Sequence, residues 1–262
     1  MRYLQTFCVV ILCTTFSLTA YSQQILGDNY QRPSYSYRSE NNPHYWKNRK
    51  PYDGYWQQDV EYSIKARIDE KTDVISGDVT LTYYNNSPDA LPFVYFHLYQ
   101  EAFQPDSYVS DLNEANDEKP TFGPYEAAGK GCDVSTITVT ARNGRNVTET
   151  TILEQDFTVL KVTLQQPIQP GSNITFRIPF DTYFDTGSLR RRMKKFKSGE
   201  FMHYDGVHWY PRICVYDRKM GWDTDQHLGK EFYGDYGSYA VELDFASNYI
   251  VEGSGWLENE AE

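Results

Sequence analysis

The sequence predicts an all-β protein, either an antiparallel β-sandwich or a saddle-shaped open sheet. Three observations support this fold class. Apolar and polar residues alternate with a period of two in many short segments, turn residues separate those segments, and no stretch carries a convincing amphipathic helical pattern. In addition, 23 of the 262 residues are Tyr, and aromatic residues favour strands.

Residues 1–22 are predicted to be a secretory signal peptide. Arg2 precedes a mostly apolar run from Leu4 to Leu18, and the small residues Ala20 and Ser22 suit a cleavage site after Ser22. The apolar run is shorter than the roughly 20 residues that span a bilayer, and no later segment is apolar enough to span one. The sequence therefore predicts a secreted or periplasmic protein without a transmembrane segment after cleavage.

Charge and cysteine content narrow the function further. The chain has 25 basic and 36 acidic residues and a net charge of −11, which disfavours binding to nucleic acid. Once the signal peptide is removed, Cys132 and Cys214 remain. They could form a disulfide in an oxidising compartment or stay as two buried thiols, and their spacing does not decide between these alternatives.

Residues 23–55 are predicted to be an extended leader rich in Tyr, Asn and Pro, which straps onto a neighbouring surface through its aromatic rings. For residues 23–37 a disordered linker is the favoured interpretation. The β-domain is expected over residues 56–262.

Period-two alternation, turn residues and apolar runs place the strands of this domain. Asn143 and Gly144 suit a type I′ hairpin turn. The irregular stretch from Pro105 to Gly131 is predicted to be an insertion over one end of the sheet. Strands are expected at residues 60–68, 75–83, 93–99, 137–141, 147–153, 157–164, 174–180, 239–245 and 249–251.

No catalytic or metal-binding residue is predicted within the chain. The sequence contains no H-E-x-x-H, G-x-S-x-G, phosphate-loop or dinucleotide motif. His203 and His208 form the one close histidine pair, for which ordinary surface histidines are the favoured interpretation. Asp223 and Asp225 could serve a glycosidase or bind calcium, although such carboxylates more often cap loops.

A basic run at residues 189–197 could bind an anionic surface or an acidic partner. A solvated loop between two strands is the favoured interpretation of that run.

The segment from His208 to Tyr239 combines aromatic, acidic and glycine residues without a regular period, which indicates a functional or interface loop. Its motifs are Trp209-Tyr210-Pro211, then Val215-Tyr216-Asp217, then Gly221-Trp222-Asp223-Thr224-Asp225. With the preceding strands, they resemble the N-terminal domain of bacterial zinc aminopeptidases of the aminopeptidase N type, within the gluzincin metallopeptidases. The resemblance covers residues 55–262.

The resemblance implies a saddle-shaped β-domain that packs over a thermolysin-like catalytic domain. That second domain carries the H-E-x-x-H zinc site, so this chain is expected to be truncated before it, to hold no cofactor and to meet peptide substrate only with it. Glu200, Tyr204 and His208 would lie on the substrate rim, where the family binds the terminal amino group. The implied interface residues are Trp209, Tyr210, Pro211, Tyr216, Asp217, Trp222, Asp223 and Asp225.

Two other functions stay open at this stage. The chain could be an exported, non-catalytic β-sandwich that binds glycans or a surface protein through rings such as Trp209 and Trp222. It could also be an adhesion domain stabilised by calcium at Asp223 and Asp225.

Overall fold

The computed structural model describes residues 35–189, 193–229 and 233–259. The predicted signal peptide and the first part of the leader lie outside these ranges. The chain divides into a unit from Tyr35 to Gly253, which holds all the helices and strands named below, and a second unit of residues 1–34 and 254–262. No helix within the described ranges is both long and apolar enough to cross a bilayer.

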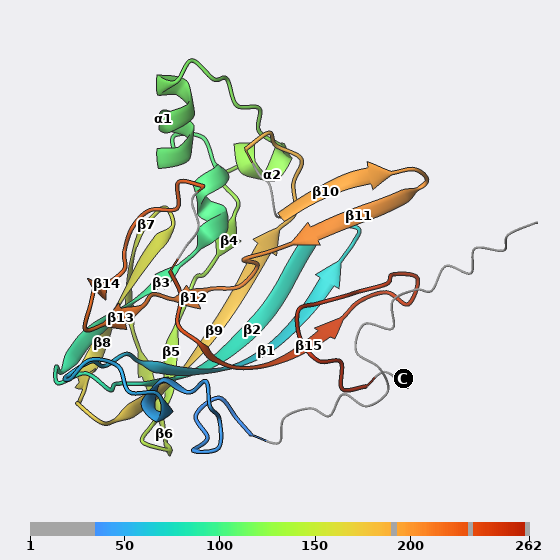
Figure 1. The fold of residues 1–262 in the computed structure, drawn as a ribbon. Coiled ribbons are helices and arrows are strands. Elements are labelled where there is room, and N and C mark those ends of the chain that lie inside the picture. The colour runs from blue at the N-terminus through green and yellow to red at the C-terminus, as the bar shows by residue number, and fades with distance from the viewer. Residues whose placement is uncertain (1–34, 190–192, 230–232, 260–262) are drawn as a thin grey trace, which may run out of the picture. The chain divides into compact units, whose positions relative to one another are not determined.

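A seven-stranded open sheet forms the larger layer of the unit Tyr35–Gly253 (Figure 1). Its central strands are β1 (Asp59–Asp69), β2 (Val74–Tyr84) and β9 (Asn173–Tyr183), which pair in antiparallel register along their whole length. The predicted alternation is confirmed there, because Tyr62, Ile64 and Ala66 are buried while Ser63 and Lys65 are exposed. The strand order is β15 (Gly237–Asp244), β1, β2, β9, β5 (Thr138–Arg142) and β6 (Arg145–Thr150), with β4 (Cys132–Asp133) also paired to β9.

A four-stranded sheet packs against the first and completes a sandwich. Its order is β12 (Arg212–Ile213), β3 (Leu91–His97), β8 (Val159–Ile168) and β7 (Ile152–Asp156). Val94 and Phe96 of β3 are fully buried. The Phe96 ring meets the Phe176 ring of β9 with centroids 5.9 Å apart, which joins the two layers in one core. The expected all-β sandwich with open sheets is confirmed.

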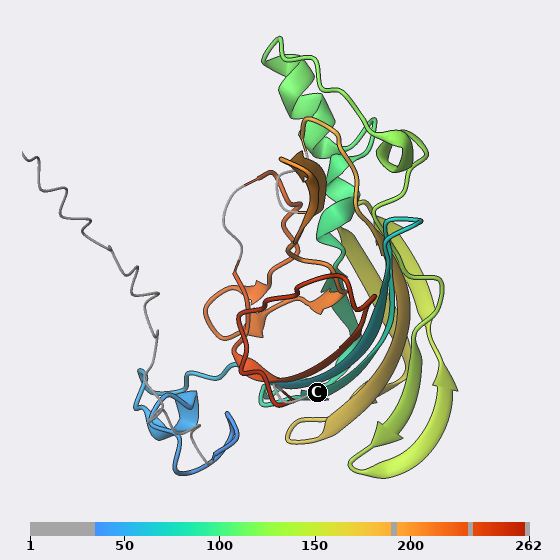
Figure 2. The same cartoon turned by 90° about the vertical axis from the view of Figure 1, so that its right-hand side faces the viewer.

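The stretch predicted as an irregular insertion contains short helices at one end of the sheets (Figure 1). They are α1 (Tyr108–Ala115) and α2 (Pro124–Ala127), and Figure 2 shows them from the side. The short helix η2 (Tyr99–Phe103) comes just before this stretch, and η1 (Trp46–Asn48) lies in the leader. Helix α1 has only eight residues, too few for a clear period, and its signal is the Ser107 cap, whose hydroxyl accepts from the Ser110 N–H at 3.2 Å. Asp185 caps α2 from a distant part of the chain by accepting from two of its N–H groups at 2.8 Å.

A hairpin that the sequence did not predict begins within the basic run. Strands β10 (Met193–Ser198) and β11 (Phe201–Gly206) pair in antiparallel register, so residues 193–197 form a strand and not a loop. Lys195 and Tyr204 attach the hairpin to the β1–β2 turn, since Lys195 Nζ lies 2.8 Å from both oxygens of Asp73 and the Tyr204 hydroxyl donates to Asp73 at 2.7 Å. Residues 190–192 lie outside the described ranges.

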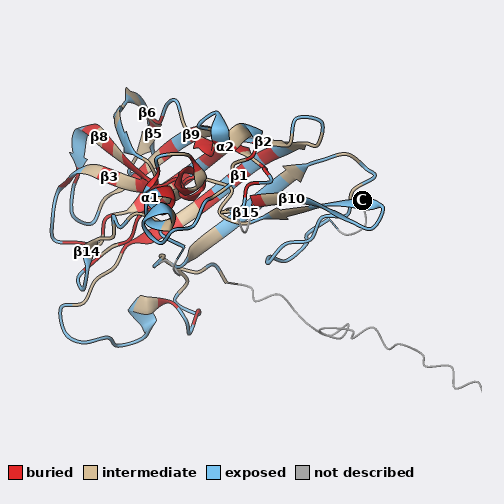
Figure 3. Ribbon diagram, turned by 90° about the horizontal axis from the view of Figure 1, so that it is seen from above, coloured by how far each residue is buried: buried red, intermediate tan, exposed pale blue. Residues whose placement is uncertain are grey.

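Strand β15 corrects the expectation of a wholly antiparallel sheet, because it runs parallel to β1. It is an edge strand, and none of its residues is buried (Figure 3). The register places Tyr239, Val241 and Leu243 beside buried side chains of β1, so the apolar inner face continues onto an exposed edge. The last predicted strand, at residues 249–251, is absent, and these residues have no strand partner among the described residues.

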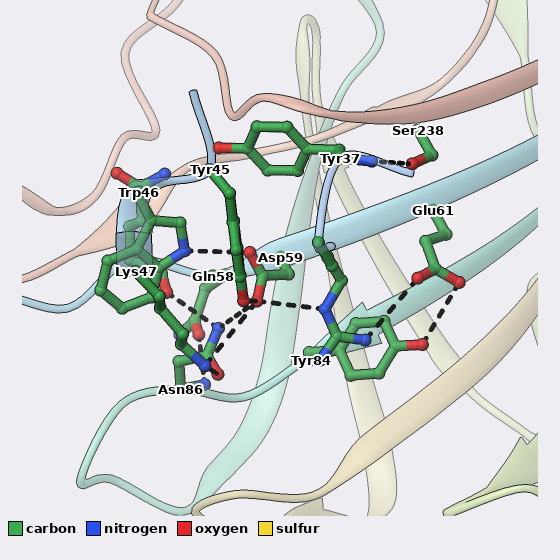
Figure 4. A network of polar contacts seen from close by, with 12 residues as sticks. Tyr37, Tyr45, Trp46, Lys47, Gln58, Asp59, Glu61, Tyr84, Asn86 and Ser238 are labelled. Carbon is green, nitrogen blue, oxygen red and sulfur yellow. Dashed lines mark hydrogen bonds and ion pairs between the residues drawn. The ribbon is translucent and has the colours of Figure 1, made fainter. Parts of the chain in front are cut away.

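The second part of the leader, residues 35–55, is held to the sheet by the buried carboxylate of Asp59 (Figure 4). The Tyr45 hydroxyl and the Trp46 indole N–H each donate to Asp59 at 2.9 Å, and the Asn86 amide donates at 3.0 Å. Arg38 Nε lies 3.3 Å from the same carboxylate, and its guanidinium lies 3.4 Å from the centroid of the Tyr84 ring. The segment therefore contacts the sheet through aromatic and charged groups.

Asp59→Ala should destabilise the fold by about 3 kcal/mol, because it removes the buried acceptor of three donors, one from the buried Tyr45 and two from the half-buried Trp46 and Asn86. Chemical denaturation monitored by circular dichroism measures the loss. Glu242→Ala is the matched control, since it removes an ion pair with Lys65 that is largely exposed. Equal stability losses in the two variants would contradict this account of Asp59.

Candidate functional site

Most of the predicted interface residues pack the segment 208–239 against the rest of the β-domain. Trp209 and Trp222 are half-buried against the core, with ring centroids 6.0 Å from Phe180 and 5.4 Å from Tyr95 respectively. The segment forms β12 and a small hairpin of β13 (Tyr216–Asp217) and β14 (Gly221–Trp222). Of the other predicted interface residues, Tyr210, Tyr216 and Asp223 are half-buried, Pro211 and Asp217 are buried, and Asp225 is exposed.

The three predicted rim residues do not form one group of contacts. Glu200 is exposed in the β10–β11 turn, and Tyr204 donates to Asp73 from the following strand. His208 has a positive φ of 58°, and its ring contacts that of Tyr99 at a tilt of 39°, with centroids 4.5 Å apart. Of the three, His208 alone joins a cluster of other chemically active side chains.

That cluster consists of imidazole and phenol rings. The Tyr99 ring lies 4.9 Å from His97 and 5.4 Å from His227, measured between centroids. Burial, together with the nearby positive charge of Arg212, lowers the pKa of His97 to about 4, so His97 is neutral at physiological pH. No group of three or more ligand-type side chains in the described ranges is arranged to hold a metal ion.

Cys132 and Cys214 are both buried free thiols in this structure. Burial raises the pKa of each thiol well above its ordinary value. Neither is therefore poised as a nucleophile.

A cleft of about 350 Å³ lies beside the cluster, at the start of β15. Its lining residues are Arg212, Gly234, Asp235, Tyr236, Gly237 and Tyr239. Strand β12 positions Arg212, which donates from its guanidinium to the Asp235 carbonyl at 3.2 Å. Gly234 is required for this approach, because a Cβ there would lie 2.0 Å from the Arg212 guanidinium.

The carboxyl group of Asp235 differs from the other polar groups of the cleft in its burial and its bonding. Its Oδ2 is buried and has no hydrogen-bond partner in the part of the chain that is described. Burial raises the pKa of this carboxyl group to about 8, and the negative charges of Asp217 and Asp59 act in the same direction, while Arg212 opposes them. A buried carboxyl oxygen without a partner favours a ligand that can form a hydrogen bond with it.

Tyrosine rings surround the guanidinium side of the cleft. The Tyr62 and Tyr239 rings are stacked with centroids 4.8 Å apart, and the Tyr210 ring lies 5.7 Å from Tyr62. The cleft thus places one cation, one unpartnered carboxyl oxygen and several aromatic surfaces together. Arg212 and Asp235 were missed in the sequence because a single Arg after Tyr210-Pro211 and a single Asp between glycine and tyrosine carry no recognisable motif.

Comparisons with known proteins gave results only among solved structures. No protein family model and no curated protein matches the chain. A two-domain M1 zinc metallopeptidase variant bound to L-arginine is 16% identical, with a TM-score of 0.38, and the match covers 73% of this chain and 33% of that one. The M1 zinc metallopeptidase from Deinococcus radiodurans is 19% identical, with a TM-score of 0.29, and the match covers 48% of this chain and 20% of that one.

A variant of the two-domain M1 enzyme bound to L-tryptophan gives a similar match, with 19% identity, a TM-score of 0.29, and coverage of 48% of this chain and 21% of that chain. The chain thus spans about a fifth to a third of the M1 structures that it matches.

Asp235→Asn should make the fold relatively more stable as pH rises. The folded carboxyl group has a pKa of about 8, whereas an unfolded Asp titrates near 3.9. The folded state therefore binds more protons between these values, and the contribution of Asp235 to stability falls as pH increases. Asn does not titrate, so the melting temperature of the variant should gain on the wild type between about pH 4 and pH 8.

Differential scanning fluorimetry across this pH range measures the difference in melting temperature between the variant and the wild type. Asp225→Asn is the control for exchanging an exposed aspartate for asparagine outside the cleft. A difference for Asp235→Asn that stays constant with pH would contradict the assigned titration.

Proposed function

We propose that this chain is the substrate-cleft domain of an exported zinc aminopeptidase-like metallopeptidase and that it acts together with a separate catalytic domain. The class comes from the resemblance of the Trp209–Asp225 motifs, and export comes from the predicted signal peptide at residues 1–22. One structural observation supports the role: the Arg212–Asp235 cleft opens onto the exposed apolar edge of β15 through the shared residue Tyr239.

The cleft suits the polar groups of a peptide. A peptide end carries N–H or ammonium donors next to carbonyl acceptors. The unpartnered Asp235 carboxyl group can donate a hydrogen bond while it is protonated and accept one when it is ionised, and Arg212 offers guanidinium donors within the same cleft. Tyr236 and Tyr239 add aromatic surface for a neighbouring side chain, so recognition of a short peptide requires no rearrangement of these groups.

The exposed edge of β15 suits a domain interface. Tyr239 and Val241 are 42% and 49% exposed although they lie on the face that is buried in β1. Covering such an apolar row would remove it from water and stabilise the assembly. A docked catalytic domain would also form the opposite wall of the Arg212–Asp235 cleft.

The catalytic domain would supply the zinc chemistry. A zinc ion held by the H-E-x-x-H motif of that domain would supply the activation of a water molecule for cleavage of the first peptide bond. The residues of this chain would orient the substrate by holding its amino end and would exclude water from one side of the cleft.

The purified chain should bind no stoichiometric zinc and should release no chromogenic product from an aminoacyl p-nitroanilide. It contains no H-E-x-x-H motif to hold and use the metal. Metal analysis and a colorimetric assay measure both properties. Zinc-dependent turnover by this chain alone would overturn the proposed division of roles.

The tagged chain should co-purify from its source cells with a zinc protein that hydrolyses the same p-nitroanilide. Val241→Asp should lose most of that activity in the eluate, because it places a charge within the apolar row. Ala240→Asp is the matched control, since Ala240 is exposed on the opposite face of β15. Equal recovery with both variants would exclude β15 as the docking edge.

A further inference from the structure

A second and larger cleft lies away from the Arg212–Asp235 site and has a different chemical character. It encloses about 650 Å³ and is lined by Gly54, Trp56, Asn86, Ser87, Pro88, Asp89 and Arg218. Three segments contribute: the end of the leader, the β2–β3 connection and the β13–β14 turn. We propose that this cleft binds a neutral carbohydrate, with a sugar ring against the Trp56 indole and its hydroxyl groups bonded to Asp89 and Arg218.

The walls of the cleft are fixed before any ligand binds. The Arg218 N–H donates to the Trp56 carbonyl at 3.0 Å, and the Tyr216 hydroxyl donates to Asp89 Oδ2 at 2.8 Å. The Asn86 side-chain amide donates to the Gln57 carbonyl at 3.0 Å. These bonds join all three segments, so a ligand would lose little affinity to ordering them.

The groups that face the opening keep unused bonding capacity. Within the part of the chain that is described, the Arg218 guanidinium, Asp89 Oδ1 and the Trp56 indole N–H make no hydrogen bond. Arg218 and Asp89 are both exposed, and Trp56 is half-buried with its ring centroid 5.0 Å from that of Tyr216. One indole, one cation and one anion are therefore available together.

This combination selects for a neutral polyol. A sugar hydroxyl both donates and accepts, so it can bond to Asp89 and to Arg218 at the same time. The C–H face of a pyranose ring is apolar and suits the flat indole. An anionic ligand would be attracted by Arg218 but repelled by the Asp89 carboxylate. A cationic ligand would be attracted by Asp89 but repelled by Arg218. A neutral ligand that both donates and accepts hydrogen bonds gains affinity from both groups.

The structure also explains why the other tryptophans of the segment 208–239 do not fit this role. The Trp222 ring is stacked on Tyr216, with centroids 4.8 Å apart, and its edge meets Tyr95. Trp209 packs between Phe180 and Tyr210. The Trp56 ring also contacts Tyr216, but of these three tryptophans Trp56 is the one that lines the cleft.

Titration of the purified chain with maltohexaose, cellohexaose and laminarihexaose tests the proposal, with binding followed by intrinsic tryptophan fluorescence and by calorimetry. At least one of these sugars should bind at millimolar concentration or below. Trp56→Ala should weaken that binding by about tenfold or more, and Arg218→Ala and Asp89→Ala should each weaken it several-fold. Lys219→Ala, an exposed cation next to Arg218, should leave it unchanged.

Melting temperatures and circular dichroism establish that each variant is folded. Trp56→Phe keeps an aromatic ring and should therefore retain part of the affinity for the sugar. Absence of binding by all three sugars would overturn the proposal, as would equal binding by Trp56→Ala and the wild type. Binding of oligogalacturonate in preference to the three neutral sugars would overturn the assigned ligand class. No zinc, peptide or catalytic partner is involved, so the outcome is independent of the peptidase proposal.

Discussion

The buried carboxylate of Asp59 is the interaction on which the arrangement of the β-domain most depends. It lies at the first position of β1 and is inaccessible to water. An ionised carboxylate in such a place is stable only with several donors, and here Tyr45, Trp46 and Asn86 provide them (Figure 4). The leader, the first strand and the β2–β3 connection thereby share one centre. Asp59 also affects a residue of each cleft, because its partner Asn86 lines one and its negative charge helps to raise the pKa of Asp235 in the other.

Burial is distributed unevenly across the large sheet, and this asymmetry separates structural from functional residues. Strands β1, β2 and β9 bury their inner side chains against β3 and β8. Burial ends at β15, where the same row of positions is open to solvent. The segment 208–239 crosses the boundary: its tryptophans pack on the core, while Arg212 and Asp235 line a cleft at the open edge. Aromatic composition alone cannot distinguish these two uses, but the burial of each ring does.

The parts of the fold that follow from local chemistry could be predicted from the sequence. The β1–β2 hairpin follows from alternation, because burial of one face demands it, and Asn143-Gly144 adopts positive φ angles of 49° and 72° as expected for its turn. Features that depend on contacts between residues far apart in the sequence could not be predicted. The parallel direction of β15 depends on topology, helix α2 depends on a cap from Asp185, and the β10–β11 hairpin lies in a basic run whose strand character comes from pairing. The partnership of Arg212 with Asp235 likewise arises only when β12 and β15 meet.

The pairing of β15 with β1 has a consequence for the synthesis of the chain. The Tyr37 N–H bonds to Ser238 Oγ across 201 positions, and Val60 pairs with Gly237 over nearly the same span. At the usual rate of translation, roughly ten to forty seconds separate the emergence of these partners. During that interval the outer edge of β1 presents unpaired N–H and C=O groups beside apolar side chains, which is the condition that promotes aggregation of nascent sheets. Strand β15 therefore covers the outer edge of β1, and premature termination before residue 237 would leave that edge without a pairing strand.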